Sequence, residues 1–500
     1  MSVNIKSFFQ PLDRVAIALM AILSLITVLL LFQGDAIAPR VRDFSWQNKR
    51  VGATDNAFYL NFSRPMNIKS VEDNLQIDPP LPGKVSWAGR KMAYTLLSPP
   101  PYGNTYQVQL NGAKDRFADR ITGKPIQPFR GVFQTRDRAF VYLGVEGDEQ
   151  GRLILYNLTR EQKTILTPKD LVVVDFKPYP TGSKILFSAS ERTSDRQGVL
   201  ITQLYSVTTG IESELNSQTN ATPGRIDLIL DDKDYQNLKF DLSADGKTIV
   251  VQRVSQKNPG DFGLWMLKTD RDRNTRPKPQ LLQSQPGGDF IITPDSSTLA
   301  VAQGQGVAIL PLQVQASKPL DFLPKFGMVL DFAPDGTKAA MVQFNSDYTR
   351  SLFLVTNQGV QKQLLRTTGS INSCQFHPVL PNLYCMLTQL VEGDTYLEQP
   401  YLAAIDLNSG KQTPLIVMPE QQDVQVSLSP DGLALLLDQI VTATTPNTSP
   451  QTIVPRTNDG EAIATSRLWL VPLLTSSTKT STQVQPQQLP LPGFHPRWLP

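Results

Sequence analysis

The sequence has few of the side chains that most catalytic and metal sites use. Its 500 residues include two cysteines and two histidines. The cysteines, Cys374 and Cys385, form no CxxC pair, which excludes zinc ribbons and thioredoxin-like redox motifs. The histidines, His377 and His495, both stand in an FHP tripeptide. We expect both to occupy one position of a repeated turn rather than to serve as a catalytic base or a metal ligand.

Known catalytic motifs and a strong charge of one sign are also absent. The sequence contains no HExxH, GxSxG, Walker A or GxGxxG motif. Its formal net charge is +3, and the basic residues are scattered along the chain rather than gathered into a patch. We therefore predict no catalytic residues, no cofactor and no nucleic-acid partner.

Two acidic clusters could supply oxygen ligands to calcium. They lie at 231–234 (DDKD) and 270–272 (DRD). Neither cluster continues into the glycine and the distal glutamate of an EF-hand loop. We interpret both as solvated loops and predict no metal site.

The longest hydrophobic run lies near the N-terminus, at 15–32 (VAIALMAILSLITVLLLF). As a helix it would be about 27 Å long, close to the thickness of a bilayer's hydrocarbon core. We expect a single-pass transmembrane anchor, with a short cytoplasmic N-terminus at 1–14 and a linker at 33–43. A signal peptide cleaved after Ala36-Ile37-Ala38 is one alternative, although Pro39 opposes cleavage there. A buried core helix is another.

Residues 44–137 show the pattern of a small β-sandwich. Apolar residues alternate with polar ones in FYLNF, from Phe58, and in TYQVQL, from Thr105. Proline and glycine clusters separate such runs, as in a sandwich of short strands. We expect Tyr106 to fill a corner of the sandwich and Trp87 to pack in its core.

The phrases in this segment resemble the bacterial Ig-like domain of the SbsA type. The matching phrases, in order, are NFSRPMN, KVSW, SPPPYGNTYQVQL and AKDRFADRITGKPI. The resemblance implies a spacer or adhesion-type module of an envelope protein, with no catalytic residues.

One phrase recurs throughout residues 138–500. Six copies pair an apolar run with a turn and a second apolar run: VVVDFKPYPTGSKILF, FDLSADGKTIVV, FIITPDSSTLAV, LDFAPDGTKAAMVQF, CQFHPVLPNLYCML and VSLSPDGLALLL. Proline followed by Asp-Gly closes a tight hairpin, which accounts for the aspartates of the phrase, such as Asp335 and Asp431. A hairpin repeated at this interval, with further strands between copies, predicts the blades of a β-propeller.

The two ends of the repeat region together make one further blade. The region opens with three expected strands from Ala139, while PGFHPRWLP at the end looks like a turn phrase with no blade after it. We expect the C-terminal strand to close the ring by joining the first three strands. This arrangement gives seven blades, with six as the fallback.

The repeats resemble the propellers of the TolB family and its WD-like relatives. The resemblance implies the fold but little about function, because such propellers serve as binding platforms, peptidase lids and lyases. Two Ser/Thr/Pro-rich insertions, near 208–233 and 441–466, interrupt the blades, and we expect them to project from one rim.

Cys374 and Cys385 are predicted to lie on the two arms of one hairpin. In an oxidising compartment they could form a disulfide at cross-strand distance. Two buried thiols are the alternative.

The sequence as a whole predicts an all-β, membrane-anchored scaffold or binding protein of a bacterial envelope, and not an enzyme. The anchor would lie in the cytoplasmic or another internal membrane, and the other domains in the periplasm or another extracytoplasmic space. The expected partner is an envelope protein or a glycan. One alternative is a propeller lyase or hydrolase that uses channel carboxylates on cell-wall or exopolysaccharide glycan. The other is an assembly factor for a membrane complex.

Overall fold

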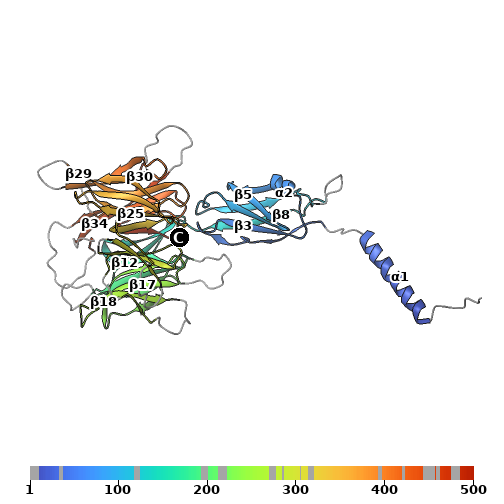
Figure 1. The fold of residues 1–500 in the computed structure, drawn as a ribbon, viewed down its shortest axis with the longest axis horizontal. Helices are drawn as coiled ribbons and strands as arrows, with labels where there is room; N and C mark the ends of the chain where they lie inside the picture. Colours follow the sequence, from blue (N-terminus) through green and yellow to red (C-terminus); the bar gives the residue numbers. More distant parts are fainter. Residues whose placement is uncertain are drawn as a thin grey trace, which may run out of the picture.

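The computed structural model describes most of the chain, and it is almost entirely β in that part. The described residues are 11–32, 38–116, 124–192, 201–211, 222–269, 278–283, 287–304, 306–312, 320–391, 397–418, 423–442, 456–457, 462–473 and 485–500. Figure 1 shows a helix, a β-sandwich and a larger ring of sheets, in this order from the N-terminus.

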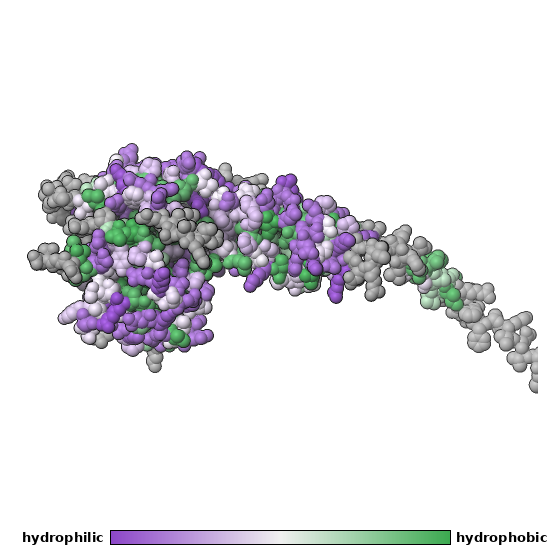
Figure 2. All heavy atoms as spheres, turned by 90° about the horizontal axis from the view of Figure 1, so that it is seen from above, coloured by the Kyte–Doolittle hydropathy of each residue, from purple (hydrophilic) through white to green (hydrophobic). Residues whose placement is uncertain are grey.

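The hydrophobic run near the N-terminus forms helix α1 (Pro11–Phe32). Its described side chains, at 15–28, are exposed, and Figure 2 shows a hydrophobic surface on this helix. Within the described residues, no helix combines the length and the apolar character that crossing a membrane requires. The predicted transmembrane anchor at 15–32 is therefore not confirmed.

The next segment folds into two four-stranded sheets that face each other as a sandwich. The sheet orders are β1-β3-β6-β5 and β2-β8-β7-β4. The strands are β1 (Val41–Phe44), β2 (Arg50–Val51), β3 (Ala57–Phe62), β4 (Leu75–Asp78), β5 (Gly83–Ala88), β6 (Lys91–Leu96), β7 (Thr105–Leu110) and β8 (Phe129–Thr135). A short helix, α2 (Ile68–Asn74), precedes β4, and the Asn67 side chain caps it by accepting a hydrogen bond from Ser70 N.

The alternating residues of the sandwich strands form one hydrophobic core. Tyr106 is buried and stacks on Phe133, with ring centroids 5.2 Å apart. Trp87 is partly buried and stacks on Phe62 at 5.6 Å. Both aromatic residues therefore pack against the core, as predicted for Trp87, while the corner position of Tyr106 stays a prediction. The linker predicted at 33–43 is too long, because β1 already begins at Val41 and pairs with β3.

Seven further four-stranded sheets lie within the described part of 139–498. Six contain consecutive strands, from the innermost to the outermost. The first three of these are β12 (Leu171–Pro178), β13 (Lys184–Glu191), β14 (Gln203–Thr208) and β15 (Ile226–Leu230); β16 (Tyr235–Leu242), β17 (Thr248–Ser255), β18 (Phe262–Lys268) and β19 (Gln280–Gln283); and β20 (Phe290–Ile292), β21 (Thr298–Gln303), β22 (Gly306–Pro311) and β23 (Asp321–Leu323).

The other three follow the same order. They are β24 (Met328–Phe332), β25 (Lys338–Phe344), β26 (Arg350–Thr356) and β27 (Gln361–Thr367); β28 (Ile371–Phe376), β29 (Asn382–Val391), β30 (Leu397–Asp406) and β31 (Gln412–Val417); and β32 (Val426–Leu428), β33 (Ala434–Thr442), β34 (Ile463–Pro472) and β35 (Gln487–Gln488). Strands thus occupy parts of both predicted insertions, and the remainder, at 212–221, 443–455 and 458–461, lies outside the described residues.

The seventh sheet joins the two ends of the repeat region. Its strands are β9 (Ala139–Gly144), β10 (Leu153–Asn157), β11 (Gln162–Ile165) and β36 (Gly493–Trp498), with a short 3₁₀ turn at Gly147–Glu149. β36 pairs antiparallel with β9 in the innermost position. The composite blade predicted from the sequence is therefore correct.

Hydrophobic clusters between neighbouring sheets close the ring. Each of the seven junctions has its own cluster of buried residues, including the junction between the composite sheet and the β32–β35 sheet. On β17, Ile249 and Val251 belong to one cluster, while Val250 belongs to the cluster on the other side. Both faces of each blade are buried, which explains the continuous apolar runs in the sequence. The fold is a seven-bladed β-propeller.

The repeated phrase forms the hairpin between the first two strands of a blade. Between β24 and β25, Gly336 adopts a φ of 69°, and Asp335 Oδ1 accepts hydrogen bonds from the Thr337 amide and hydroxyl. Gly432 has the same role between β32 and β33, with a φ of 73°. These turns need a residue that tolerates positive φ, as the Asp-Gly pairs predicted.

Candidate binding site

The propeller has two faces that differ in what covers them. The turn face carries the hairpins of the repeated phrase, and the open face carries the opposite ends of the same strands. The sandwich lies against the turn face, where the C-terminus also lies (Figure 1). The open face is consequently directed away from both the sandwich and α1.

Asp431 joins the sandwich to the turn face. Its Oδ1 accepts hydrogen bonds from Ser429 Oγ (2.6 Å) and Leu433 N (3.1 Å), which hold the hairpin. Its Oδ2 accepts hydrogen bonds from Tyr102 N of the sandwich (3.3 Å) and from the Arg138 guanidinium (3.2 Å). The side chain is 2% exposed, so it is shielded from solvent. The sequence explained Asp431 by its turn alone, and this second role was missed.

Two further contacts support the same junction. The Arg136 guanidinium donates hydrogen bonds to the backbone carbonyls of Pro500 (2.7 Å) and Pro180 (3.2 Å). The Tyr102 hydroxyl accepts a hydrogen bond from Ala53 N, and burial raises the pKa of this tyrosine to about 12. The junction is therefore a network of hydrogen bonds between groups withdrawn from water.

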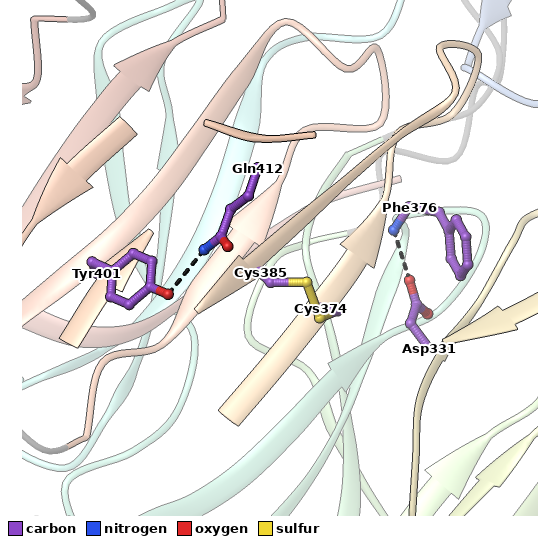
Figure 3. The surroundings of a disulfide bond; sticks show 6 residues. All are labelled: Asp331, Cys374, Phe376, Cys385, Tyr401 and Gln412. Carbon is purple, nitrogen blue, oxygen red and sulfur yellow. Dashed lines mark hydrogen bonds between the residues drawn. A yellow bond between two sulfur atoms is a disulfide. The ribbon is translucent and has the colours of Figure 1, made fainter. Parts of the chain in front are cut away.

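A second polar feature runs around the innermost strands, and we call it the inner ring. It comprises the residue at one equivalent position of each inner strand: Lys177, Asp241, Ile291, Asp331, Gln375, Ser427 and Arg497. Four of these side chains accept a hydrogen bond from a backbone N–H of the next blade. The pairs are Asp241 with Ile292, Asp331 with Phe376 (Figure 3), Gln375 with Leu428 and Ser427 with Trp498, at 2.7 to 3.1 Å.

The carboxylates of the inner ring have structural partners. Besides Ile292 N, Asp241 accepts hydrogen bonds from its neighbour Leu242 N and from Lys177 of the preceding blade. Burial raises the pKa of Asp331 to about 7, although hydrogen bonds from backbone amides oppose the shift. These groups connect blades, which is a sufficient explanation for their presence without catalysis.

The two histidines do not share a position of the repeat, so that prediction was wrong. His377 follows its inner strand, and its Nδ1 accepts hydrogen bonds from Val379 N (3.0 Å) and Leu380 N (2.8 Å) in a turn. His495 lies within β36, two residues before Arg497 of the inner ring, with a φ of 52°. Its Nε2 accepts a hydrogen bond from Arg497 Nε (3.1 Å), and burial lowers its pKa to about 4. Neither histidine is arranged as a catalytic base.

The open face contains a cavity of about 630 Å³. It lies where the β24–β27, β28–β31 and β32–β35 blades meet, at the ends of the strands away from the turn phrases. Its lining is largely polar, and the charged side chains in it are Arg350, Glu398 and Asp423. This volume falls in the range of small-molecule sites.

Exposed apolar side chains stand on the same three blades at the same face. They are Phe344, Tyr348, Leu390, Val391 and Val441. Tyr348 is 92% exposed, in the turn between β25 and β26. An exposed apolar rim around a polar cavity is typical of an interaction surface.

The remaining predicted residues lie elsewhere. Cys374 and Cys385 are direct cross-strand partners on β28 and β29 and form a disulfide (Figure 3). Within the acidic segment at 231–234, the carboxylates have separate partners, such as Gln203 for Asp232 and Lys257 for Asp234. The segment at 270–272 lies outside the described residues. In the described part of the chain, no three His, Cys, Asp or Glu side chains are grouped to hold a metal ion.

Comparisons with known proteins give similarities of fold. No family model and no curated protein matches the chain. Similar solved structures include TolB from Acinetobacter baumannii (14% identity, TM-score 0.38, 70% of this chain and 80% of that one). They also include an oligogalacturonate lyase in complex with manganese (11% identity, TM-score 0.42, 58% of this chain and 79% of that one). A third is a putative 6-phosphogluconolactonase from Bacteroides fragilis (10% identity, TM-score 0.40, 72% of this chain and 97% of that one).

A member of the TolB family, which the repeats of this chain resemble, is thus among the structures found. The similarities do not extend to the SbsA-type resemblance of the sandwich, which stays a prediction. At these identities and TM-scores they carry no inference about function.

Proposed function

We propose that the protein is a non-catalytic scaffold that presents the open face of its propeller to a partner. The observation that carries this proposal is the docking of the sandwich on the turn face through Asp431 and Arg136. Docking on that side keeps the sandwich away from the cavity and from the apolar rim of the open face. The partner is an envelope protein or a glycan of the same compartment.

The inner ring argues against an enzyme that works through carboxylates of the channel. Glycan hydrolysis needs two carboxyl groups free to face the substrate. Asp241 and Asp331 instead accept backbone hydrogen bonds across blade junctions. An assembly factor for a membrane complex is one form that such a scaffold takes.

We also propose an extracytoplasmic location at a membrane surface. Two observations support it: the exposed apolar side chains of α1 and the disulfide between Cys374 and Cys385. Exposed apolar surface of this kind is stabilised by lipid, and disulfides persist in oxidising compartments. The sandwich would act as a spacer between the membrane and the propeller. Cell fractionation tests this part, because removal of residues 11–32 should release the protein from the membrane fraction.

Crosslinking and co-purification of the full-length chain test the scaffold proposal. A partner recovered in fixed stoichiometry is the expected result. Leu390→Asp, on the open face, should release this partner. Leu320→Asp changes a more exposed leucine (66% against 44% for Leu390) beside β23 at the turn face, and it should retain the partner. Release by Leu320→Asp alone would contradict the proposal.

A further inference from the structure

The cavity on the open face has a floor of neutral hydrogen-bonding groups. Hydroxyl and amide side chains line it from β28, β29 and the loops before β28 and β32: Ser370, Asn372, Ser373, Thr388 and Gln425. Such groups both donate and accept hydrogen bonds. A ligand that fits them carries many small groups which do the same.

The charges of the cavity disfavour an anion and largely offset one another. Two carboxylates, Glu398 and Asp423, and one guanidinium, Arg350, belong to its lining. The carboxylates outnumber the guanidinium and would repel an anion, while Arg350 offsets part of their attraction for a cation. Arg350 Nη1 is bound to the backbone carbonyls of Gly369 (3.0 Å) and Thr368 (3.4 Å), which holds the charge in place.

The acidic side chains are also held in place. Glu398 Oε2 accepts a hydrogen bond from Thr388 Oγ1 (2.5 Å), and the same hydroxyl accepts one from Ser370 N (2.6 Å). Asp423 Oδ1 accepts a hydrogen bond from Gln425 Nε2 (3.0 Å). Side chains fixed in this way lose little conformational freedom when a ligand binds.

An aromatic ring forms one wall of the cavity. Phe344 is 56% exposed, and its ring lies directly over Gly327. A Cβ at residue 327 would come within 2.5 Å of this ring, so the glycine is what allows the ring to lie there. A flat apolar ring beside hydroxyl-binding groups matches the two surfaces of a sugar, the C–H face of its ring and its hydroxyl edge.

We propose that this cavity binds a neutral saccharide. The inference rests on the proposed function, because it names the ligand class of the open face. Phe344 would stack on a sugar ring, and the hydroxyl, amide and carboxylate groups of the floor would bind its hydroxyls. The volume of about 630 Å³ has room for a short oligosaccharide.

Calorimetric titration of the full-length chain tests the proposal. The full-length chain is kept in detergent because α1 exposes apolar side chains. The detergent should carry a polyoxyethylene head group, because a sugar head group would compete with the saccharide probes. The probes are two neutral tetrasaccharides (chitotetraose and maltotetraose), a cationic one (tetraglucosamine) and an anionic one (tetragalacturonate). We expect binding of a neutral probe in preference to both charged ones. The proposal would be overturned if a charged probe bound more tightly than both neutral ones. It would also be overturned if no probe bound.

Two matched pairs of variants locate the binding. Phe344→Ser removes the ring, and Gly327→Ala displaces it without altering its chemistry, so each should weaken binding about tenfold or more. Phe322→Ser and Gly306→Ala change an equivalent pair, in which a Cβ at residue 306 would come within 2.4 Å of the Phe322 ring, outside the cavity lining. Equal losses in both pairs would refute the site.

The titration and the partner experiment fail separately. If no tetrasaccharide binds but Leu390→Asp still releases a co-purifying protein, the saccharide proposal is wrong and the scaffold proposal stands. The other outcome is that Leu390→Asp releases no protein, while chitotetraose or maltotetraose binds the wild type and binds Phe344→Ser more weakly. In that case the saccharide site is confirmed and the partner is the glycan itself.

Discussion

The two faces of the propeller are built from the same strands but present different surfaces. On the turn face, hairpins of one repeated phrase provide Asp431 and the carbonyl of Pro180, and these bind the sandwich. On the open face, strand ends of three blades surround a polar cavity with exposed apolar side chains. The regular face carries the docked sandwich, and the irregular face carries the proposed recognition site.

This difference follows from the constraints on each face. A tight hairpin between buried strands accepts few sequences, since it needs particular residues at fixed φ. The loops of the opposite face only connect strands, so their sequences can change to suit a ligand without disturbing the fold. The same propeller can therefore keep one face constant while the other face adapts.

The largest effect is expected where the ring that carries both faces is closed. Trp498 on β36 is buried, packs edge to face on Phe140 and donates hydrogen bonds to Ser427 from its backbone and its indole. Trp498→Ala should lower the free energy of unfolding by about 3–5 kcal/mol in chemical denaturation. Tyr348→Ala, at an exposed aromatic residue, should change it by less than about 0.5 kcal/mol. Equal effects would show that β36 does not close the ring.

The next largest effect is expected from a substitution that weakens the docking of the sandwich on the turn face. Asp431→Asn leaves one acceptor oxygen in place of two. The side chain can then accept hydrogen bonds either from the hairpin or from Tyr102 and Arg138, but not from both sets. We expect a cost of about 1–3 kcal/mol, which would speed trypsin cleavage at 136–138 by about 5- to 150-fold. Asp335→Asn is the matched control, because its turn uses Oδ1 alone. Unchanged cleavage in Asp431→Asn would refute the docking contact.

A smaller effect concerns a buried acid beneath the open face. Asp438 is fully buried and accepts hydrogen bonds from Gln425 N of the cavity floor and from His495 N. Burial raises its pKa to about 7, so between about pH 4 and 7 the folded state binds a proton that the unfolded state does not. This contribution to stability is therefore lost as the pH rises through 7.

Thermal unfolding between pH 5 and 8 measures this loss. The wild-type melting temperature should fall as the pH rises to about 7. Asp438→Asn should make this slope shallower because its amide does not titrate, and Asp331, whose pKa burial also raises to about 7, supplies the remaining slope. Hydrogen bonds from Thr337 lower the pKa of Asp335, whose titration lies below this window, so Asp335→Asn should keep the wild-type slope. An unchanged slope in Asp438→Asn would show that Asp438 does not titrate between pH 5 and 8.

The smallest effect on stability is expected at the rim of the open face. Tyr348→Ser and Leu390→Ser remove exposed side chains, so the free energy of unfolding should change by less than about 0.5 kcal/mol. Val360→Ser is an equivalent change at the turn face, between β26 and β27. A large destabilisation by Tyr348→Ser would mean that the rim packs structurally and is not a recognition surface.

Much of the propeller could be predicted from the sequence because its signals are local and repeated. The turn phrase at 330–344 defined the inner hairpin, and the orphan strand at the C-terminus implied ring closure, which β36 confirms. The inner ring carries a similar signal, since Asp241 and Asp331 each stand four positions before the aspartate of their turn phrase. A comparison of the copies at that position would have found it.

The candidate site had no such signal. Its lining comes from three blades, and residues as distant as Arg350 and Asp423 meet only when the propeller folds. The histidines failed for the same reason, because identical FHP tripeptides lie at different positions of the strand in the two copies. Local patterns report hairpins, whereas a cavity between blades depends on packing.

Site-specific photo-crosslinking in living cells tests the comparison of the two faces most directly. A photo-reactive amino acid at position 348 samples the open face, and one at position 360 samples the turn face. The account predicts a specific crosslinked partner from position 348 and none from position 360. A partner captured from position 360 but not from position 348 would contradict it.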